Sequence, residues 1–153
     1  MNKTTLLETA DQLKQVSEIA ANEYQDKADL LISKMNNRML ERPDIIGLVG
    51  ESNLNMMKDN HSNHIRFISS MLKNKNSEVL VETILWVFRA YRSHHFTSNY
   101  WAAQLNTWLL IFKEELTVES YNEIYPYYEW MQINIPVFVK VSDEKLDATF
   151  SLH

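Results

Sequence analysis

The sequence contains no cysteine, which excludes disulfide bonds, thiolate catalysis, cysteine-based zinc sites and thioether attachment of a cofactor. Glycine occurs only twice and proline three times in 153 residues. Hairpins and tight turns need more of both residues, so their scarcity favours long helices. Long apolar runs are also missing, because WLLIF (108–112) is far shorter than the roughly 20 residues that a membrane helix needs.

Positive charge is scarce as well, since 15 Lys and Arg residues face 20 Asp and Glu residues and leave a net charge of −5. An acidic chain without a basic stripe is a poor candidate for binding nucleic acid or an anionic membrane surface. The N-terminal stretch MNKTTLLETADQLKQ has no apolar region of the kind found in signal peptides. We therefore expect a cytoplasmic protein with neither nucleic acid nor membrane among its partners.

What is present is a pattern of apolar residues at helical spacing through most of the chain, which predicts an all-α fold of about six helices. The expected helices are 3–25, 27–40, 53–73, 78–95, 97–116 and a last one that starts at 117. The segment ERPD (41–44) breaks the chain, and IIGLVGES (45–52) has the composition of a turn or connector. Pro126 and Pro136 must kink or interrupt the last helix. We expect a single helical domain over 1–140 and a loose tail over 141–153.

Two histidines lie in the middle of an apolar helical stripe in MMKDNHSNHIRFISSML (56–72). His61 and His64 are three residues apart, so one helix face carries both and one metal ion could contact both. Further metal ligands are missing, because the chain has no Glu-x-x-His and no His-Glu-x-x-His pattern. In the pair His94–His95 adjacent side chains diverge by about 100° around a helix, so only one could add a ligand. We predict no metal site and treat packed or hydrogen-bonded histidines as the ordinary alternative.

A haem is a second possibility for a histidine inside a helical bundle, with His64 or His94 as the proximal ligand. Catalytic motifs are absent: the two glycines stand in GLVG, which fits no nucleotide-binding loop, and no Ser–His–Asp order stands out. We therefore expect a protein that is not an enzyme. The 4 Trp, 7 Tyr and 6 Phe residues exceed the needs of a minimal core, and such a surplus is typical of a ligand pocket or a subunit interface.

The stretch from 60 to 116 resembles the phycobilisome/globin-like helical domains. The resemblance rests on Asn60, on the step Asn63–His64–Ile65, on EVLVETILWVFRAYRSHHF (78–96) and on the helix that follows. It is closest to the non-photosynthetic bacterial modules often found ahead of cobalamin-binding or signalling domains. The resemblance implies a globin-like fold with a cleft between the His64 helix and the Trp86 helix, and a homodimer formed through helices.

Light-harvesting members of that family hold a bilin through a cysteine thioether and pair it with an aspartate. Here Met57 occupies the cysteine-like place and Asn60 the aspartate-like place, so covalent attachment of a bilin is excluded. Without that aspartate, a bilin bound without a covalent bond also loses its expected counter-charge. The cofactor is therefore unknown from the sequence, and a haem or a bilin-like tetrapyrrole is possible.

Three hypotheses follow from these observations. The first is a sensory or interaction module that binds an apolar or planar ligand between helices, as a homodimer. Its candidate ligand-binding residues are His61, His64, Trp86, Tyr91 and His94. The second is a haem- or metal-binding protein that uses His61 and His64. The third is a structural partner protein without a ligand.

Overall fold

The computed structural model describes the backbone of residues 2–151 and the side chains of residues 2–144. Within this part the chain forms nine helices and no strand, so the predicted all-α class is confirmed. The helices are α1 (Lys3–Asp11), α2 (Glu18–Asp26), α3 (Ala28–Leu40), α4 (Ile45–Val49), α5 (Leu54–Lys73), α6 (Ser77–Arg92), α7 (Ser98–Glu115), α8 (Val118–Ile133) and α9 (Ile135–Ser151). The predicted number, about six, is too low.

The first expected helix, 3–25, is in fact two helices, α1 and α2, separated by residues 12–17. Ser17 starts α2, because its hydroxyl accepts a hydrogen bond from the N–H of Ala20. The side chain of Gln15 donates to the carbonyl of Leu72 at 2.5 Å and accepts from the N–H of Lys75 at 2.8 Å. These contacts with the end of α5 hold the segment in a non-helical path.

The other two additional helices arise at the predicted connector and at the second proline. Residues 45–49 form the short helix α4, which ends at Gly50 with φ of 94°, a conformation that glycine adopts without steric cost. Pro126 lies inside α8 and does not end it, whereas Pro136 lies in the first turn of α9, where proline is tolerated. The expected loose tail starts within α9, whose helical backbone continues to Ser151. Residues 152–153 lie outside the described chain.

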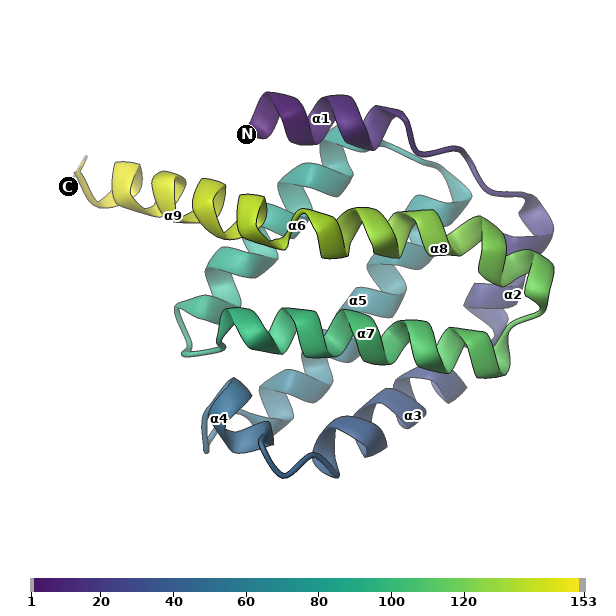
Figure 1. Ribbon diagram of the computed structural model, residues 1–153, viewed down its shortest axis with the longest axis horizontal. Helices are drawn as coiled ribbons and strands as arrows, with labels where there is room; N and C mark the ends of the chain where they lie inside the picture. The colour runs from purple at the N-terminus through teal and green to yellow at the C-terminus, as the bar shows by residue number, and fades with distance from the viewer. Residues whose placement is uncertain (1, 152–153) are drawn as a thin grey trace.

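The helices are arranged in two layers that cross each other (Figure 1). In the front layer α7 packs against α8, and α9 continues the line of α8; α5 and α6 cross behind them. At one side α2 and α3 pack against α5, while α1 and α9 pack against α6 at the other. No helix of the described chain has the length and apolar character that would let it cross a bilayer.

Large side chains fill the space between the two layers. Trp108, Tyr24, Tyr100, Tyr128 and Phe112 are all fully buried. The stripe of α5 that faces them contains Met57, His61, Ile65, Ile68 and Leu72, all buried as the helical spacing predicts. The space between these side chains also contains a cavity.

Candidate functional site

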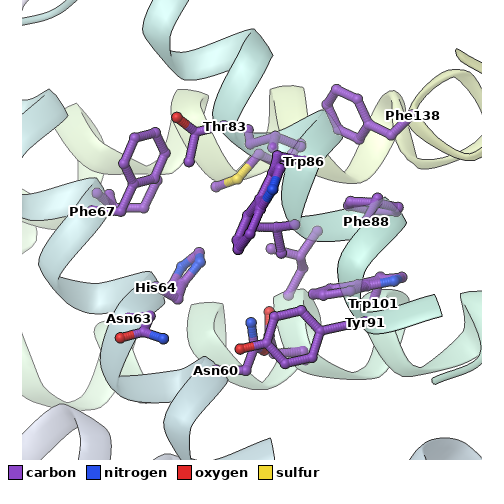
Figure 2. A pocket seen from close by; sticks show the side chains of 16 residues that line it. Asn60, Asn63, His64, Phe67, Thr83, Trp86, Phe88, Tyr91, Trp101 and Phe138 are labelled. Atoms are coloured by element: carbon purple, nitrogen blue, oxygen red, sulfur yellow. The ribbon is translucent and has the colours of Figure 1, made fainter. Parts of the chain in front are cut away.

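A partly open cavity of about 210 Å³ lies between α5, α6 and α7, and side chains of α8 and α9 complete its wall. Its wall is mainly apolar and aromatic. Asn60 and Asn63 lie at one end, here called the polar end, and Thr83 lies at the opposite end (Figure 2). The principal apolar lining residues are Phe67, Ile68, Trp86, Phe88, Trp101 and Phe138. The rings of Phe88 and Trp101 are stacked with centroids 4.5 Å apart, which gives the wall a flat section.

Three of the five residues that the sequence nominates for a ligand come together around this cavity. His64 on α5 and Trp86 and Tyr91 on α6 all line it, and Figure 2 shows Trp86 standing between His64 and Phe88. Trp86 is 59% exposed, so its indole also reaches the surface of the protein. A cavity thus lies between the His64 helix and the Trp86 helix.

His94 does not belong to this site, contrary to the sequence-based prediction. Helix α6 ends at Arg92 and not at 95, so His94 lies in the turn that follows and is exposed. Its backbone carbonyl accepts a hydrogen bond from Nδ2 of Asn53 at 2.6 Å, and the next residue, His95, has φ of 77°. The helical face expected to carry His94 into the cavity ends before that residue.

His61 is fully buried and does not line the cavity, so the structure does not bring it together with the residues around that space. Its Nδ1 is 2.7 Å from Oδ1 of Asn36 on α3, on the other side of α5. The ring also contacts Trp108 edge to face, with centroids 6.0 Å apart. Burial lowers the pKa of His61 to about 3, with a smaller contribution from the neighbouring His64, so the ring stays neutral.

His64 is anchored by a chain of hydroxyl groups behind it. Its Nε2 is 2.7 Å from the hydroxyl of Tyr128, which in turn is 2.7 Å from the hydroxyl of Tyr24. The ring also stacks on Trp108 with centroids 5.4 Å apart. Burial lowers the pKa of His64 to about 3, so the imidazole is neutral near pH 7.

The burial of Tyr24 sets the direction of this hydrogen-bond chain. Its hydroxyl contacts only that of Tyr128 within the described part of the chain, so the proton of Tyr24 has no other acceptor. Tyr24 therefore donates to Tyr128, and Tyr128 donates its own proton to Nε2 of His64. The proton of the neutral imidazole then resides on Nδ1. The chain consequently holds His64 in one tautomer and one orientation at the edge of the cavity.

The two histidines do not form one metal-ligand set. Each ring already has a different protein partner, and Trp108 contacts both of them. Across residues 2–144 there is no group of three or more His, Asp or Glu side chains placed to hold one ion. The hypothesis that His61 and His64 bind a metal or a haem together has no geometric support here.

The polar end of the cavity is formed by residues that the sequence analysis did not nominate as ligand-binding. Oδ1 of Asn60 accepts hydrogen bonds from the hydroxyl of Tyr100, at 2.8 Å, and from Nε2 of Gln104. Asn60 and Gln104 line the cavity and are 3% and 1% exposed, and Figure 2 shows Asn60 next to Tyr91. Asn60 could have been predicted from the sequence, because its i, i+4 spacing with His64 places both on the same side of one helix. No comparable pattern in the sequence pointed to Gln104.

Family models, curated proteins and solved structures were all compared with the chain, and no match was found in any of the three comparisons.

Proposed function

We propose that this chain is a non-catalytic helical module, sensory or interaction-mediating, that binds a small planar apolar ligand in the cavity beside His64. The observation that carries the proposal is the cavity itself. Well-packed protein interiors leave few voids larger than a water molecule, so an aromatic-walled space of about 210 Å³ is a candidate binding site. The globin-like relationship and a cytoplasmic location stay part of the proposal.

The size of the cavity narrows the class of ligand. An engineered apolar cavity of about 150 Å³ binds benzene, and drug-sized ligands occupy about 300–1,000 Å³. At about 210 Å³ this cavity suits one or two rings. A haem or bilin has four pyrrole rings and would require the helices to move apart, so the tetrapyrrole version of the proposal is the weaker one.

Naphthalene is a suitable apolar probe, followed by the amide NMR resonances of the protein. We expect it to shift resonances of α5, α6 and α7 around the cavity. Val87→Trp places a large ring inside the cavity and should weaken naphthalene binding by at least about tenfold, because the space is filled. Leu110→Trp is the control, since Leu110 on α7 is 59% exposed and does not line the cavity. Absence of binding, or equal binding by the two variants, would overturn the proposal.

We also propose that two copies pair through α6. Val79 and Trp86 are both exposed on α6 at an i, i+7 spacing, which places them on one face. A second copy packed on this face would cover Trp86, a residue that also lines the cavity. The interface and the ligand site would then share one side chain.

Sedimentation at micromolar concentration tests this pairing. We expect a species of twice the 18.1 kDa chain mass, which Trp86→Lys converts to the monomer. Leu110→Lys is the control, because Leu110 on α7 is 59% exposed, the same fraction as Trp86. A wild-type protein that sediments only as the monomer would contradict the proposed dimer.

A further inference from the structure

We infer that the cavity selects a neutral one- or two-ring compound that carries an amide edge, meaning a C=O and an N–H on adjacent atoms. This inference rests on the proposed function and names the class of ligand for the same cavity. Four features of the described residues support it: the unused hydrogen-bonding atoms of two buried amides, their access to the cavity, the absence of charge in the wall, and the cavity size.

The first feature is that one side-chain atom of Asn60 and one of Gln104 make no hydrogen bond within the protein. Oδ1 of Asn60 accepts from Tyr100 and from Gln104, and Nε2 of Gln104 also donates to the Tyr100 hydroxyl at 2.9 Å. An amide oxygen accepts two hydrogen bonds and an amide nitrogen donates two. Oδ1 of Asn60 therefore accepts as many hydrogen bonds as it can, and Nε2 of Gln104 donates as many as it can. Nδ2 of Asn60 keeps two free N–H groups, and Oε1 of Gln104 keeps its lone pairs.

The second feature is that these two free atoms are open to the cavity. Within the described chain, the fully enclosed side-chain atoms without a hydrogen-bond partner belong to His61, Trp101 and Trp108. Nδ2 of Asn60 and Oε1 of Gln104 are not among them, although both residues are almost completely buried and line the cavity. Because both side chains line the cavity, we place these two atoms toward it. Beside the other polar lining residues, Asn63, His64, Thr83 and Tyr91, the cavity then presents a donor and an acceptor on two amides that already contact each other.

The third feature is the absence of charge. Among the side chains of residues 2–144, no Asp, Glu, Lys or Arg lines the cavity. The Tyr24–Tyr128 hydroxyl chain directs a proton toward Nε2 of His64, which keeps that imidazole neutral. An ionised ligand would lose its hydration without meeting an opposite charge, at a cost of several kcal/mol. Carboxylates, phosphates and ammonium compounds are therefore rejected.

The fourth feature is the combination of size and polarity. A buried donor and acceptor lose free energy if the ligand leaves them unpaired, so a purely apolar ring is a poorer ligand than one with a matching edge. An amide edge supplies a C=O for Nδ2 of Asn60 and an N–H for Oε1 of Gln104. The rest of a bicyclic ligand would contact the apolar wall, which includes Trp86 and the stacked pair of Phe88 and Trp101.

Calorimetric titration with four bicyclic probes tests the inference. The probe 2-quinolone carries the amide edge, N-methyl-2-quinolone lacks the N–H, and naphthalene has neither polar group; 1-methylnaphthalene reports the steric cost of the methyl group. After correction for that cost, we expect 2-quinolone to bind at least about tenfold more tightly than N-methyl-2-quinolone, one buried hydrogen bond being worth about that factor. Because this comparison uses the unaltered protein, it does not depend on the folding of any variant.

A variant assigns the preference to the polar end. Gln104→Met removes the acceptor and should reduce the preference for 2-quinolone to less than about twofold, with naphthalene binding retained. Gln132→Met is the control, because Gln132 on α8 does not line the cavity, and it should keep the full preference. If naphthalene binds and 2-quinolone shows no preference in the unaltered protein, the amide-edge inference is wrong and the proposed function stands. If none of the probes binds, the proposed function is wrong as well.

Discussion

At the scale of single residues, Tyr128 joins α8 to two other helices through one hydroxyl group. It lies between Tyr24 of α2 and His64 of α5, with 2.7 Å to each partner atom. All three groups are removed from bulk water to a large extent, and burial raises the pKa of both Tyr24 and Tyr128. The position of His64 beside the cavity thus depends on a hydroxyl chain that a single substitution can interrupt.

We predict that Tyr128→Phe lowers the free energy of unfolding by about 1–3 kcal/mol, because it leaves the Tyr24 hydroxyl and Nε2 of His64 without partners. Urea denaturation measures this change. Tyr125→Phe on the same helix is the control, since Tyr125 is only partly buried, and we expect a change within about 0.5 kcal/mol there. Equal effects of the two substitutions would show that the hydroxyl chain contributes nothing.

The buried His61 and the partly buried His64 make stability depend on pH in a defined direction. In an unfolded chain the histidine pKa is about 6.5, whereas burial lowers the pKa of His61 and His64 to about 3 in the folded protein. Between these values the unfolded state binds more protons. The free energy of unfolding is therefore highest above about pH 6.5 and falls as the pH decreases toward 3, by up to about 1.4 kcal/mol per pH unit for each histidine.

Urea denaturation at about pH 6 and about pH 5 should differ by roughly 2 kcal/mol in the free energy of unfolding, and His64→Asn should remove about half of that difference. The choice of this interval avoids most carboxylate titration. A difference that is absent, or one that His64→Asn and His61→Asn both leave unchanged, would mean that these rings are not held neutral by the fold.

At the scale of the helices, Glu23 of α2 caps the start of α8. Its carboxylate accepts hydrogen bonds from the N–H of Thr117 at 2.8 Å, from the hydroxyls of Thr117 and Ser120, and from Nζ of Lys27 at 3.0 Å. Burial by itself would raise its pKa, but these hydrogen bonds together lower the pKa of Glu23 to about 2. A negative charge at a helix N-terminus is also favoured by the helix dipole.

Because the folded pKa of Glu23 lies below the unfolded value, its contribution to stability is complete above about pH 4.5 and is lost as the pH falls toward 2. Glu23→Gln should remove the same contribution at neutral pH and lower the free energy of unfolding by about 1–3 kcal/mol. The exposed Glu8 of α1 provides the control, and Glu8→Gln should change that free energy by less than about 0.5 kcal/mol. Thermal or urea denaturation that cannot separate the two variants would refute the capping role.

The helix interiors could be predicted from the sequence, but several of their ends could not. The apolar periodicity over 53–73 and 97–116 is a local property, and it located α5 and α7 to within a few residues. The break at 12–17 depends on Gln15, whose partners Leu72 and Lys75 are 57 and 60 residues away in the sequence. The end of α6 before His94 likewise depends on the turn that connects it to α7, so the expected helical face was extended too far.

At the scale of the whole molecule, the cavity lies between α5, α6 and α7, and the way these helices pack together could not be predicted from the sequence. Spacing along one helix put His64 on an apolar face, and Trp86 and Tyr91 on the facing helix, and the structure brings these three together. The same spacing could not predict that His61 and His64 have different surroundings. His61 contacts Asn36 of α3, and the position of α3 beside α5 is not visible in the spacing. The spacing also could not predict the hydrogen bond between Asn60 of α5 and Gln104 of α7.

The most direct test of the central claim is a crystal structure of the protein grown with 1-bromonaphthalene, in which the anomalous signal of bromine locates the ring. We predict a bromine peak between α5, α6 and α7, within the cavity lined by His64, Trp86 and Tyr91. A peak found only on the surface, or an interior in which side chains fill this space and exclude the probe, would contradict the claim that the protein is built to hold a small planar ligand.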